Sequence, residues 1–352
     1  MSFFRRNIGI DVGTSKAVAY LRGRGIIFHE PSVVALDYYN EKIIAVGEEA
    51  EALLGRTPGN VSLIKPIEEG VIANFEAAEH LLHYILKKSL GRSIIKPNAI
   101  LSVPSHITQV QKRALMQACK NAGAYKVFLI DEVLASAFGI GIDIKDPLGQ
   151  MIIDIGAGSV SIGVVAKGQV VLSVGRRIGG ENFNRAIKKF VADKYDLFIG
   201  EETTEKIKRT IASLSKEAEP KGMEVGGRSK LYGLPTKIML NSNEIFEAIA
   251  PVVEEIFYHL KILLSKTPPE LSADLVNRGA YITGSSAQIP GFVELLSNHL
   301  GIPVSLAEYP GTCTVRGTAK AMQWMEDYDS EGKKDYAKRD HSLEKKEILR
   351  KR

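Results

Sequence analysis

The chain has 352 residues, of which 45% are hydrophobic and 25% are charged, a composition typical of a soluble globular protein with room for two domain-sized cores. Its formal net charge of +5 is too weak to indicate a nucleic-acid partner, and its two cysteines are too few for a secreted disulfide framework. No signal peptide precedes the first residues and no apolar run reaches the roughly 20 residues of a membrane span, so we expect a cytoplasmic protein with only peripheral membrane contact.

The first predicted element is a hairpin with a polar tip. An apolar strand runs into Asp11, a turn follows, and two more apolar runs come at 17–20 and 26–28. The turn holds Gly13, Thr14 and Ser15. Short apolar runs separated by glycine turns predict antiparallel strands.

Strand and helix signals then alternate along the chain. Residues 30–70 hold short strand signals broken by proline and glycine, which predicts a small insertion without a core of its own. Apolar spacing predicts the elements that follow, namely a helix at 76–90, a strand at 98–104, a helix at 109–122, a strand at 126–130 and a helix that ends near 136. This alternation predicts an α/β architecture.

The hairpin pattern returns 143 positions later (154 minus 11). An apolar strand ends in Asp154, and further apolar runs follow at 162–165 and 168–172. The turn after Asp154 holds Gly156, Ala157, Gly158 and Ser159. Two copies of one pattern predict a chain built from two similar halves.

The second half continues with helices predicted at 183–195 and 201–214 and, after a variable stretch at 219–235, a long helix at 244–264. A strand at 280–283 then opens into a turn of Gly284, Ser285 and Ser286. Residues 326–352 are nearly all charged or polar, so we expect this tail to be disordered or a lone surface helix.

Both hairpin tips offer the groups that a polyphosphate needs. Glycine lets backbone N–H groups approach closely, hydroxyl groups can donate, and an aspartate can hold hydrated Mg²⁺. One such tip alone can be merely a tight turn. Two tips that face each other would clamp a nucleotide between the halves.

Three of these motifs resemble those of a known superfamily. Asp11 to Thr14, Asp154 to Ser159 and Thr283-Gly284 are similar to the first phosphate, second phosphate and adenosine motifs of the actin, Hsp70 and sugar kinase superfamily. Within it the chain resembles the MreB family of bacterial actins from about residue 7 to about 324. The segments that support this narrower resemblance lie at 25–35, 55–59, 69–73, 232–235 and 267–271.

The resemblance implies an actin-like ATPase fold of two ribonuclease H-like halves, with a nucleotide cleft between them and small inserted subdomains. It also implies the following division: subdomain IA at 1–29, 71–145 and 311–325, subdomain IB at 30–70, subdomain IIA at 146–181 and 244–310, subdomain IIB at 182–243, and a charged tail at 326–352.

Roles for single residues follow from the same resemblance. Asp11 and Asp154 would hold Mg²⁺ through water, and Glu132 would position the water that attacks ATP and accept its proton. Alternatively, Glu132 only complements the N-terminus of its helix. Glu205 and Lys208 would bind the ribose, unless they form a solvated ion pair one helical turn apart.

The resemblance implies phosphate and adenosine contacts for a larger set of residues. These residues are Gly13, Thr14, Ser15, Lys16, Gly156, Ala157, Gly158, Ser159, Gly179, Gly180, Gly284, Ser285 and Ser286. For Lys16 the alternative is a position on the surface without such a contact.

The chain departs from the family pattern around this site. Val133 replaces a proline, Ser159 a threonine and Ser161 a glutamate. Ser285 and Ser286 replace two glycines, which adds Cβ atoms where the base should lie. Lys16 stands where asparagine is usual in the family. We therefore expect a divergent paralogue that binds ATP and Mg²⁺ and hydrolyses ATP slowly.

The resemblance further implies a cytoskeletal protein that polymerises into filaments, as antiparallel double protofilaments, and supports cell shape. We expect it at the inner face of the cell membrane, where membrane-anchored morphogenesis proteins are further partners and nucleic acid is not one. Exposed apolar residues beside basic ones would contact anionic lipid, with local packing as the alternative; they are Phe3, Phe4, Ile94 and Ile95.

Two other functions fit the same superfold. A small-molecule kinase would need a general base on the substrate side, and the chain offers no spare carboxylate motif for it. A chaperone ATPase would need a peptide-binding domain after the second half, where only the charged tail remains.

Overall fold

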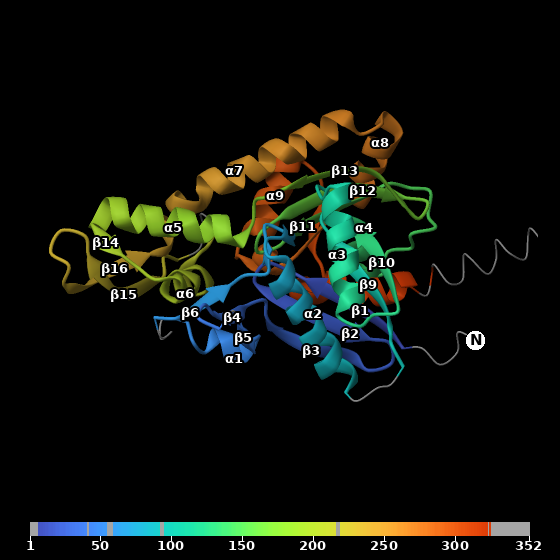
Figure 1. Ribbon diagram of the computed structural model, residues 1–352. Helices are drawn as coiled ribbons and strands as arrows, with labels where there is room; N and C mark the ends of the chain where they lie inside the picture. Colours follow the sequence, from blue (N-terminus) through green and yellow to red (C-terminus); the bar gives the residue numbers. More distant parts are fainter. Residues whose placement is uncertain are drawn as a thin grey trace, which may run out of the picture.

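The computed structural model describes residues 6–40, 42–54, 59–91, 95–215, 219–322 and 324. Two five-stranded sheets form its centre (Figure 1). The first has the order β3 (Gly25–Pro31), β2 (Lys16–Leu21), β1 (Asn7–Val12), β9 (Asn98–Val103), β10 (Lys126–Asp131). The second has the order β13 (Gln169–Arg176), β12 (Val160–Ala166), β11 (Gln150–Ile155), β17 (Ala280–Thr283), β18 (Val304–Leu306).

The strand that leads to the aspartate lies at the centre of each sheet. β1 pairs antiparallel with β2 and parallel with β9. β11 pairs in the same way with β12 and β17. Asp11 and Asp154 therefore lie at equivalent points of two sheets with the same topology. This arrangement confirms the two similar halves that the repeated pattern predicted.

Helices cover these sheets and connect them. The first half contains α2 (Phe75–Leu90) and α3 (Gln109–Asn121). The second half contains α5 (Gly180–Tyr195), α6 (Glu201–Ile211), α7 (Ser242–Lys266), α8 (Pro269–Arg278) and α9 (Phe292–Leu300), with short 3₁₀ turns η1 (Ser285–Gln288) and η2 (Pro310–Thr312). Helix α4 (Glu132–Ile140) contacts strands of both sheets, and a final helix follows at 313–322.

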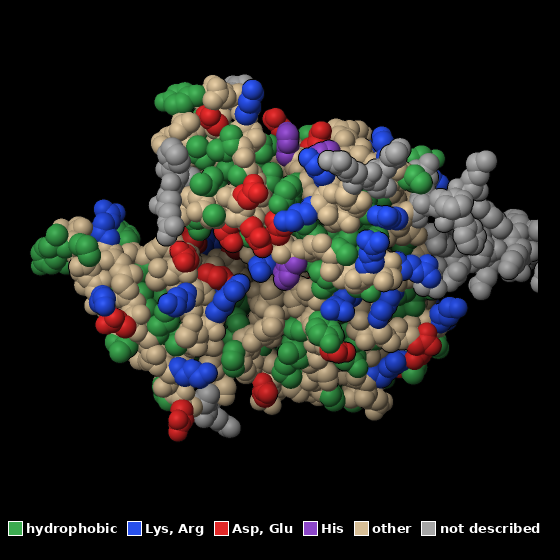
Figure 2. Space-filling view, turned by 90° about the horizontal axis from the view of Figure 1, so that it is seen from below, with side chains coloured by type: hydrophobic (Ala, Val, Ile, Leu, Met, Phe, Trp, Pro, Cys, Tyr) green, Lys and Arg blue, Asp and Glu red, His purple; other side chains and the backbone are tan. Residues whose placement is uncertain are grey.

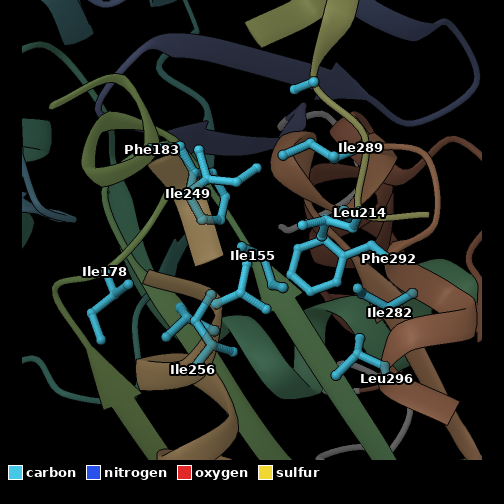
Figure 3. Close-up of a cluster of buried hydrophobic side chains, with 14 of the residues drawn as sticks. Ile155, Ile178, Phe183, Leu214, Ile249, Ile256, Ile282, Ile289, Phe292 and Leu296 are labelled. Carbon is cyan, nitrogen blue, oxygen red and sulfur yellow. The ribbon is translucent and has the colours of Figure 1, made fainter. Parts of the chain in front are cut away.

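Side-chain packing explains why these elements assemble. Each half has its own core of buried aliphatic side chains. Figure 3 shows part of the core of the second half, where Phe183, Ile249 and Phe292 lie around Ile155. A third cluster joins the halves, because it combines residues of α4 and the final helix with Ile100 of the first sheet and others of the second. Burial of this apolar surface is the main force that holds the halves together.

The final helix approaches its neighbours at glycines. A Cβ atom on Gly317 would stand 2.6 Å from the carbonyl carbon of Ala135, and one on Gly139 would stand 2.8 Å from that of Cys313. A Cβ on Gly9 would stand 3.1 Å from Thr318 Cβ. The helix therefore packs against α4 and β1 more closely than any side chain at these glycines would allow.

A small sheet is inserted in each half. The first, β5 (Lys42–Val46), β4 (Val34–Asp37), β6 (Val61–Ile64), lies beside α1 (Glu48–Glu51), and β7 (Ile67–Glu68) pairs with β8 (Val71–Ile72) close by in the sequence. The second is β14 (Leu197–Phe198), β15 (Gly222–Ser229), β16 (Pro235–Asn241). Figure 1 shows both three-stranded sheets on the same side of the two large ones.

Some elements differ from the predictions. Part of the stretch taken as variable at 219–235 forms β15, and α6 ends at Ile211 rather than near 214. Helices α8 and α9 were not predicted. The division into four subdomains stays a prediction, and the tail lies outside the described residues. In the part of the chain that the structure describes, no helix is both long enough and apolar enough to cross a membrane.

Candidate functional site

The two turns after the aspartates have the same backbone hydrogen bond. In the first turn the N–H of Gly13 donates to the carbonyl of Lys16 at 3.0 Å. In the second the N–H of Gly156 donates to the carbonyl of Ser159 at 2.9 Å. Each glycine lies two positions after its aspartate, so the repeat extends to the conformation of the turns.

These two turns contact each other across the halves. A Cβ atom on Gly158 would stand 2.9 Å from Thr14 Cβ and 3.0 Å from Glu69 Cα. The Thr14 hydroxyl is buried and accepts the N–H of Gly70 at 3.2 Å. The segment that enters β8 therefore lies against both tips, which places three backbone segments around one point.

Asp11 is the carboxylate behind the first turn. Its Oδ1 accepts a hydrogen bond from the Ser102 hydroxyl at the end of β9, at 2.8 Å. Burial and, to a smaller extent, the charge of Asp154 raise the pKa of Asp11 to about 6, although the Ser102 hydrogen bond favours the ionised form. Near neutral pH the ionised carboxylate is therefore destabilising, and a cation beside it would offset that cost.

Asp154 is its counterpart behind the second turn. Its Oδ2 accepts hydrogen bonds from the hydroxyls of Ser136 on α4 at 2.9 Å and Thr314 on the final helix at 2.7 Å. Burial raises its pKa, and these two hydroxyls oppose that effect. The final helix thus completes the surroundings of the second carboxylate.

Glu132 is the first residue of α4 and lies in its first turn. Asp131 already caps α4, because its Oδ1 accepts the N–H of Val133 at 2.8 Å. Glu132 Oε2 instead accepts a hydrogen bond from the Ser161 hydroxyl at 2.8 Å. Burial, followed by the charges of Asp154 and Asp11, raises the pKa of Glu132 well above its ordinary value. Helix capping therefore does not explain its position.

The raised pKa of Asp11 leads to a stability prediction. Between about pH 4 and 6 the folded protein binds a proton at Asp11 that the unfolded chain releases, so stability falls as the pH rises through that window. Replacing Asp11 with Asn removes this cost while keeping an acceptor for Ser102.

In nucleotide-free protein with chelator at pH 7, we expect Asp11→Asn to raise the melting temperature by a few degrees. The difference from the wild type should shrink towards zero below pH 4, where both forms are neutral. A variant that melts lower than the wild type at pH 7 would show that ionised Asp11 stabilises the fold.

Gly179 and Gly180 support the second turn. The N–H of Gly180 donates to the carbonyl of Gly156 at 3.0 Å, and the N–H of Glu181 donates to that of Ala157 at 2.7 Å. A Cβ on Gly179 would stand 2.7 Å from the Gly156 oxygen, so this approach requires glycine. The start of α5 therefore fixes the second turn through its own backbone.

Glu205 and Lys208 form a largely enclosed pair on α6. Their side chains are joined at 2.7 Å, and Lys208 Nζ also donates to the carbonyl of Gly180 at 3.1 Å. Burial disfavours ionised Glu205, but hydrogen bonds from Lys208, Asn184 and Arg209 outweigh it and lower its pKa to about 2. Of the two side chains, Lys208 is 12% exposed and Glu205 is 36% exposed, so the pair is enclosed mainly at Lys208, and its contact with a ribose stays a prediction.

The third turn packs against the second. Gly284 has φ +93°, and a Cβ there would stand 2.5 Å from the carbonyl carbon of Ile155. Ser286 is buried, and its hydroxyl donates to the carbonyl of Gly156 at 2.9 Å, whereas Ser285 is exposed. The serine hydroxyl at 286 is thus a structural donor to the second turn.

The other predicted site residues are exposed or lie outside the described residues. Lys16 is exposed at the start of β2, next to the turn. Of the predicted membrane residues, Ile95 is 48% exposed. The other three, Phe3, Phe4 and Ile94, lie outside the described residues.

The donor set around the turns fits a hydrated Mg²⁺ ion. Oxygen ligands suit Mg²⁺, which keeps several waters and takes one or two carboxylates. Among the described residues, no three His, Cys, Asp or Glu side chains gather closely enough to hold a metal directly. That Asp11 and Asp154 hold the ion through water stays a prediction.

Sequence reasoning missed the residues that hold these carboxylates. Ser102 could have been suspected, because it is the second-last residue of β9, the strand that pairs in parallel with β1. Ser136 lies one helical turn after Glu132. Thr314 has no local signal, since it lies 160 positions from Asp154.

A set of ion pairs across the halves was also missed. Glu69 pairs with Arg177 at 3.3 Å and approaches Arg185 at 4.0 Å. Lys65 pairs with Glu181 on α5. The segment 65–70 is thus linked by ion pairs to the second half beside the two turns. Each exposed pair alone contributes little to stability.

Comparisons with known proteins agree on one family. The family model described as MreB/Mbl protein matches residues 5–330. The cell shape-determining protein Mbl of Bacillus subtilis (strain 168) is 40% identical over 324 residues, which cover 92% of this chain and 97% of that protein. The cell shape-determining protein MreB of Escherichia coli (strain K12) is 39% identical over 329 residues, with coverage of 92% and 95%.

Solved structures confirm the actin-like fold. MreB5 of Spiroplasma citri bound to AMPPNP is similar with a TM-score of 0.89 at 31% identity, covering 94% of this chain and 99% of that one. The MamK double helical filament is similar in fold, with a TM-score of 0.77 at 19% identity and coverage of 91% and 99%.

Proposed function

Because the chain belongs to the MreB/Mbl family of actin-like cell-shape proteins, we propose that it binds ATP and assembles into filaments that support cell shape. The observation that carries this proposal is the pair of matching turns in contact across the halves, each with a carboxylate behind it. A nucleotide held between the turns would contact both halves at once. Its hydrolysis or loss would therefore change how the halves sit relative to each other.

ATP with Mg²⁺ is the proposed ligand. Structures of Spiroplasma citri MreB5 with AMPPNP and with ADP support it. The phosphates would accept backbone N–H and hydroxyl donors of the two turns, and Glu205 with Lys208 would contact the ribose. Mg²⁺, held through water by Asp11 and Asp154, would supply positive charge beside the phosphates.

Slow hydrolysis is the proposed reaction. The oxygen of a water molecule would bond to the terminal phosphorus of ATP as the bond from that phosphorus to ADP breaks. Glu132 would take the proton of this water at Oε1, because its Oε2 accepts from Ser161. Burial and the neighbouring carboxylates raise the pKa of Glu132, so the ionised form that acts as base is disfavoured, in line with slow hydrolysis.

Self-assembly is supported by an exposed apolar tip between β15 and β16. Leu231, Tyr232 and Leu234 are 67%, 78% and 63% exposed. Figure 2 shows hydrophobic side chains at this far end of the molecule, where β15 and β16 turn in Figure 1. Exposed apolar groups on a projecting hairpin mark an interaction site, and we propose another copy of the chain as the partner.

Sedimentation tests the assembly. We expect the purified protein to pellet with ATP and Mg²⁺ and to stay largely in the supernatant with chelator. Negative-stain images of the pellet should show filaments, and paired antiparallel protofilaments are the arrangement we expect. Monomers that persist with ATP and Mg²⁺ over a range of salt, with and without anionic lipid, would contradict the proposed function.

The same assay tests the tip. A Tyr232→Ser, Leu234→Ser double variant should lose most pelleting while it keeps ATP affinity, because the tip is remote from the turns. Val276→Ser, at a residue 61% exposed on α8, is the matched control and should pellet normally. Equal pelleting of both variants would show that the contact between copies does not involve the tip.

We further propose that the filaments lie on the cytoplasmic face of the membrane. Ile95 is 48% exposed beside Lys96, a combination that suits an anionic interface. Membrane-anchored morphogenesis proteins are the proposed partners there. Flotation with vesicles that contain phosphatidylglycerol tests the lipid contact, and protein that stays at the bottom of the gradient would exclude it.

A further inference from the structure

Ser161 connects the two halves of the molecule at the candidate catalytic carboxylate. It lies on β12 in the second sheet, directly opposite Asp154, and its side chain is fully buried. Its hydroxyl donates to Glu132 Oε2 at 2.8 Å and accepts the backbone N–H of Ser105 at 3.3 Å. Both of these partners belong to the first half, since Ser105 follows β9 and Glu132 follows β10.

The direction of these two hydrogen bonds is fixed by their chemistry. A backbone N–H can only donate, so the Ser105 N–H must point at the oxygen of Ser161. The single proton of the Ser161 hydroxyl is then free to point at Glu132. The hydroxyl therefore has one orientation, and it presents a donor to one oxygen of the carboxylate.

The ionised form of Glu132 needs such a donor because the charged side chains around it are carboxylates that repel it. The charges of Asp154, Asp11 and Asp131 all disfavour ionised Glu132, and among the causes of its altered pKa the Ser161 hydrogen bond is the one that favours the ionised form. Ser105 also donates to both carboxylate oxygens of Asp131, at 2.9 and 3.0 Å. Ser105 thus contacts Asp131 through its hydroxyl and Ser161 through its backbone N–H.

We propose that Ser161 is the positioning residue for Glu132, so that the catalytic carboxylate is aligned only when the two halves lie in this relative position. The proposal rests on the proposed ATP hydrolysis. A rotation of the halves would lengthen the bond to Glu132 or the bond to Ser105, and Oε1 would no longer be held towards a water. The reaction rate then depends on the arrangement of the halves through one hydroxyl.

A graded series of variants at position 161 tests this role. Ser161→Ala removes the donor, Ser161→Cys leaves a weak one, and Ser161→Thr restores a hydroxyl. We expect Ser161→Ala to slow single-turnover phosphate release about tenfold or more, with ATP affinity within about twofold of wild type. Ser161→Cys should be intermediate, and Ser161→Thr should recover most of the rate. Ser297→Ala is the control and should match the wild type. It removes a hydroxyl of α9 that donates a hydrogen bond to the carbonyl of Ile302.

Infrared spectroscopy gives a second measurement that needs no turnover. The carboxyl band of Glu132, identified by its loss in Glu132→Gln, should shift in Ser161→Ala and return in Ser161→Thr. A band that does not move in Ser161→Ala would overturn the proposal, as would equal losses of ATP affinity and rate in Ser161→Ala and Ser161→Thr, which indicate a packing role. If the wild type releases no phosphate, the proposed hydrolysis is wrong. The infrared band still tests the contact: a shift in Ser161→Ala shows that Ser161 holds Glu132, and an unshifted band shows that it does not.

Discussion

Replacing Glu132 with Gln should slow phosphate release by about 100-fold or more while ATP affinity stays within about twofold of wild type. Glutamine keeps the shape of the side chain and an oxygen for the Ser161 hydroxyl, but it cannot take a proton from water. Loss of its negative charge does not weaken the attraction of a polyphosphate, and Asp11 and Asp154 keep their charges for a cation. The substitution therefore separates binding from the chemical step.

Single-turnover phosphate release and nucleotide titration measure the two quantities. Because the base must be ionised, the wild-type rate should rise with pH through the raised pKa of Glu132, and the variant should lack this rise. Glu76→Gln, at an exposed carboxylate in the first turn of α2, is the matched control. Equal rates in wild type and Glu132→Gln would exclude Glu132 as the base.

Replacing Gly158 with Ala should weaken ATP binding by about tenfold or more, because an overpacked contact typically costs about 1–3 kcal/mol. The new Cβ would stand 2.9 Å from Thr14 Cβ, 3.0 Å from Glu69 Cα and closer still to the Thr14 hydroxyl. Thr14 cannot turn aside without loss of its bond from Gly70. The two turns must therefore move apart, and a ligand that contacts both loses part of its contacts.

Isothermal titration with ATP and Mg²⁺ measures this effect, together with a melting curve that shows whether the fold survives. Gly59→Ala is the matched control, because a Cβ at Gly59 would meet nothing within 4 Å. We expect the control to bind as the wild type does. A Gly158→Ala protein that binds ATP normally would mean that the nucleotide does not bridge the two turns.

Local pattern was enough to predict the parts of the site that the chain repeats. Asp11 and Asp154 each end an apolar strand and precede a glycine turn, so the sequence shows both the strand and the tip. The two equivalent sheets then follow from the same repeat. The pairing of Glu205 with Lys208 is likewise local, because the two residues lie one helical turn apart.

Contacts between distant residues could not be predicted in this way. Sequence reasoning treated Ser286 as an obstacle with an added Cβ, whereas its hydroxyl donates to Gly156, 130 positions away. Ser161 was noted only as a missing glutamate, and its bond to Glu132 depends on how two sheets meet. Helices α8 and α9 were missed although proline and glycine mark their ends, because 10 and 9 residues give only a short stretch of apolar periodicity.

The position of the final helix sets a time before which the surroundings of Asp154 cannot be complete. Asp154 is surrounded by a hydroxyl from α4 and by that of Thr314, which the ribosome adds 160 residues after the aspartate. At about 5–20 residues per second, translation needs roughly 10–30 s to cover that distance. A nascent chain that contains both glycine turns but not Thr314 lacks one of the two hydroxyls that hold Asp154. We therefore expect the surroundings of the second turn to be completed only after the final helix has been synthesised.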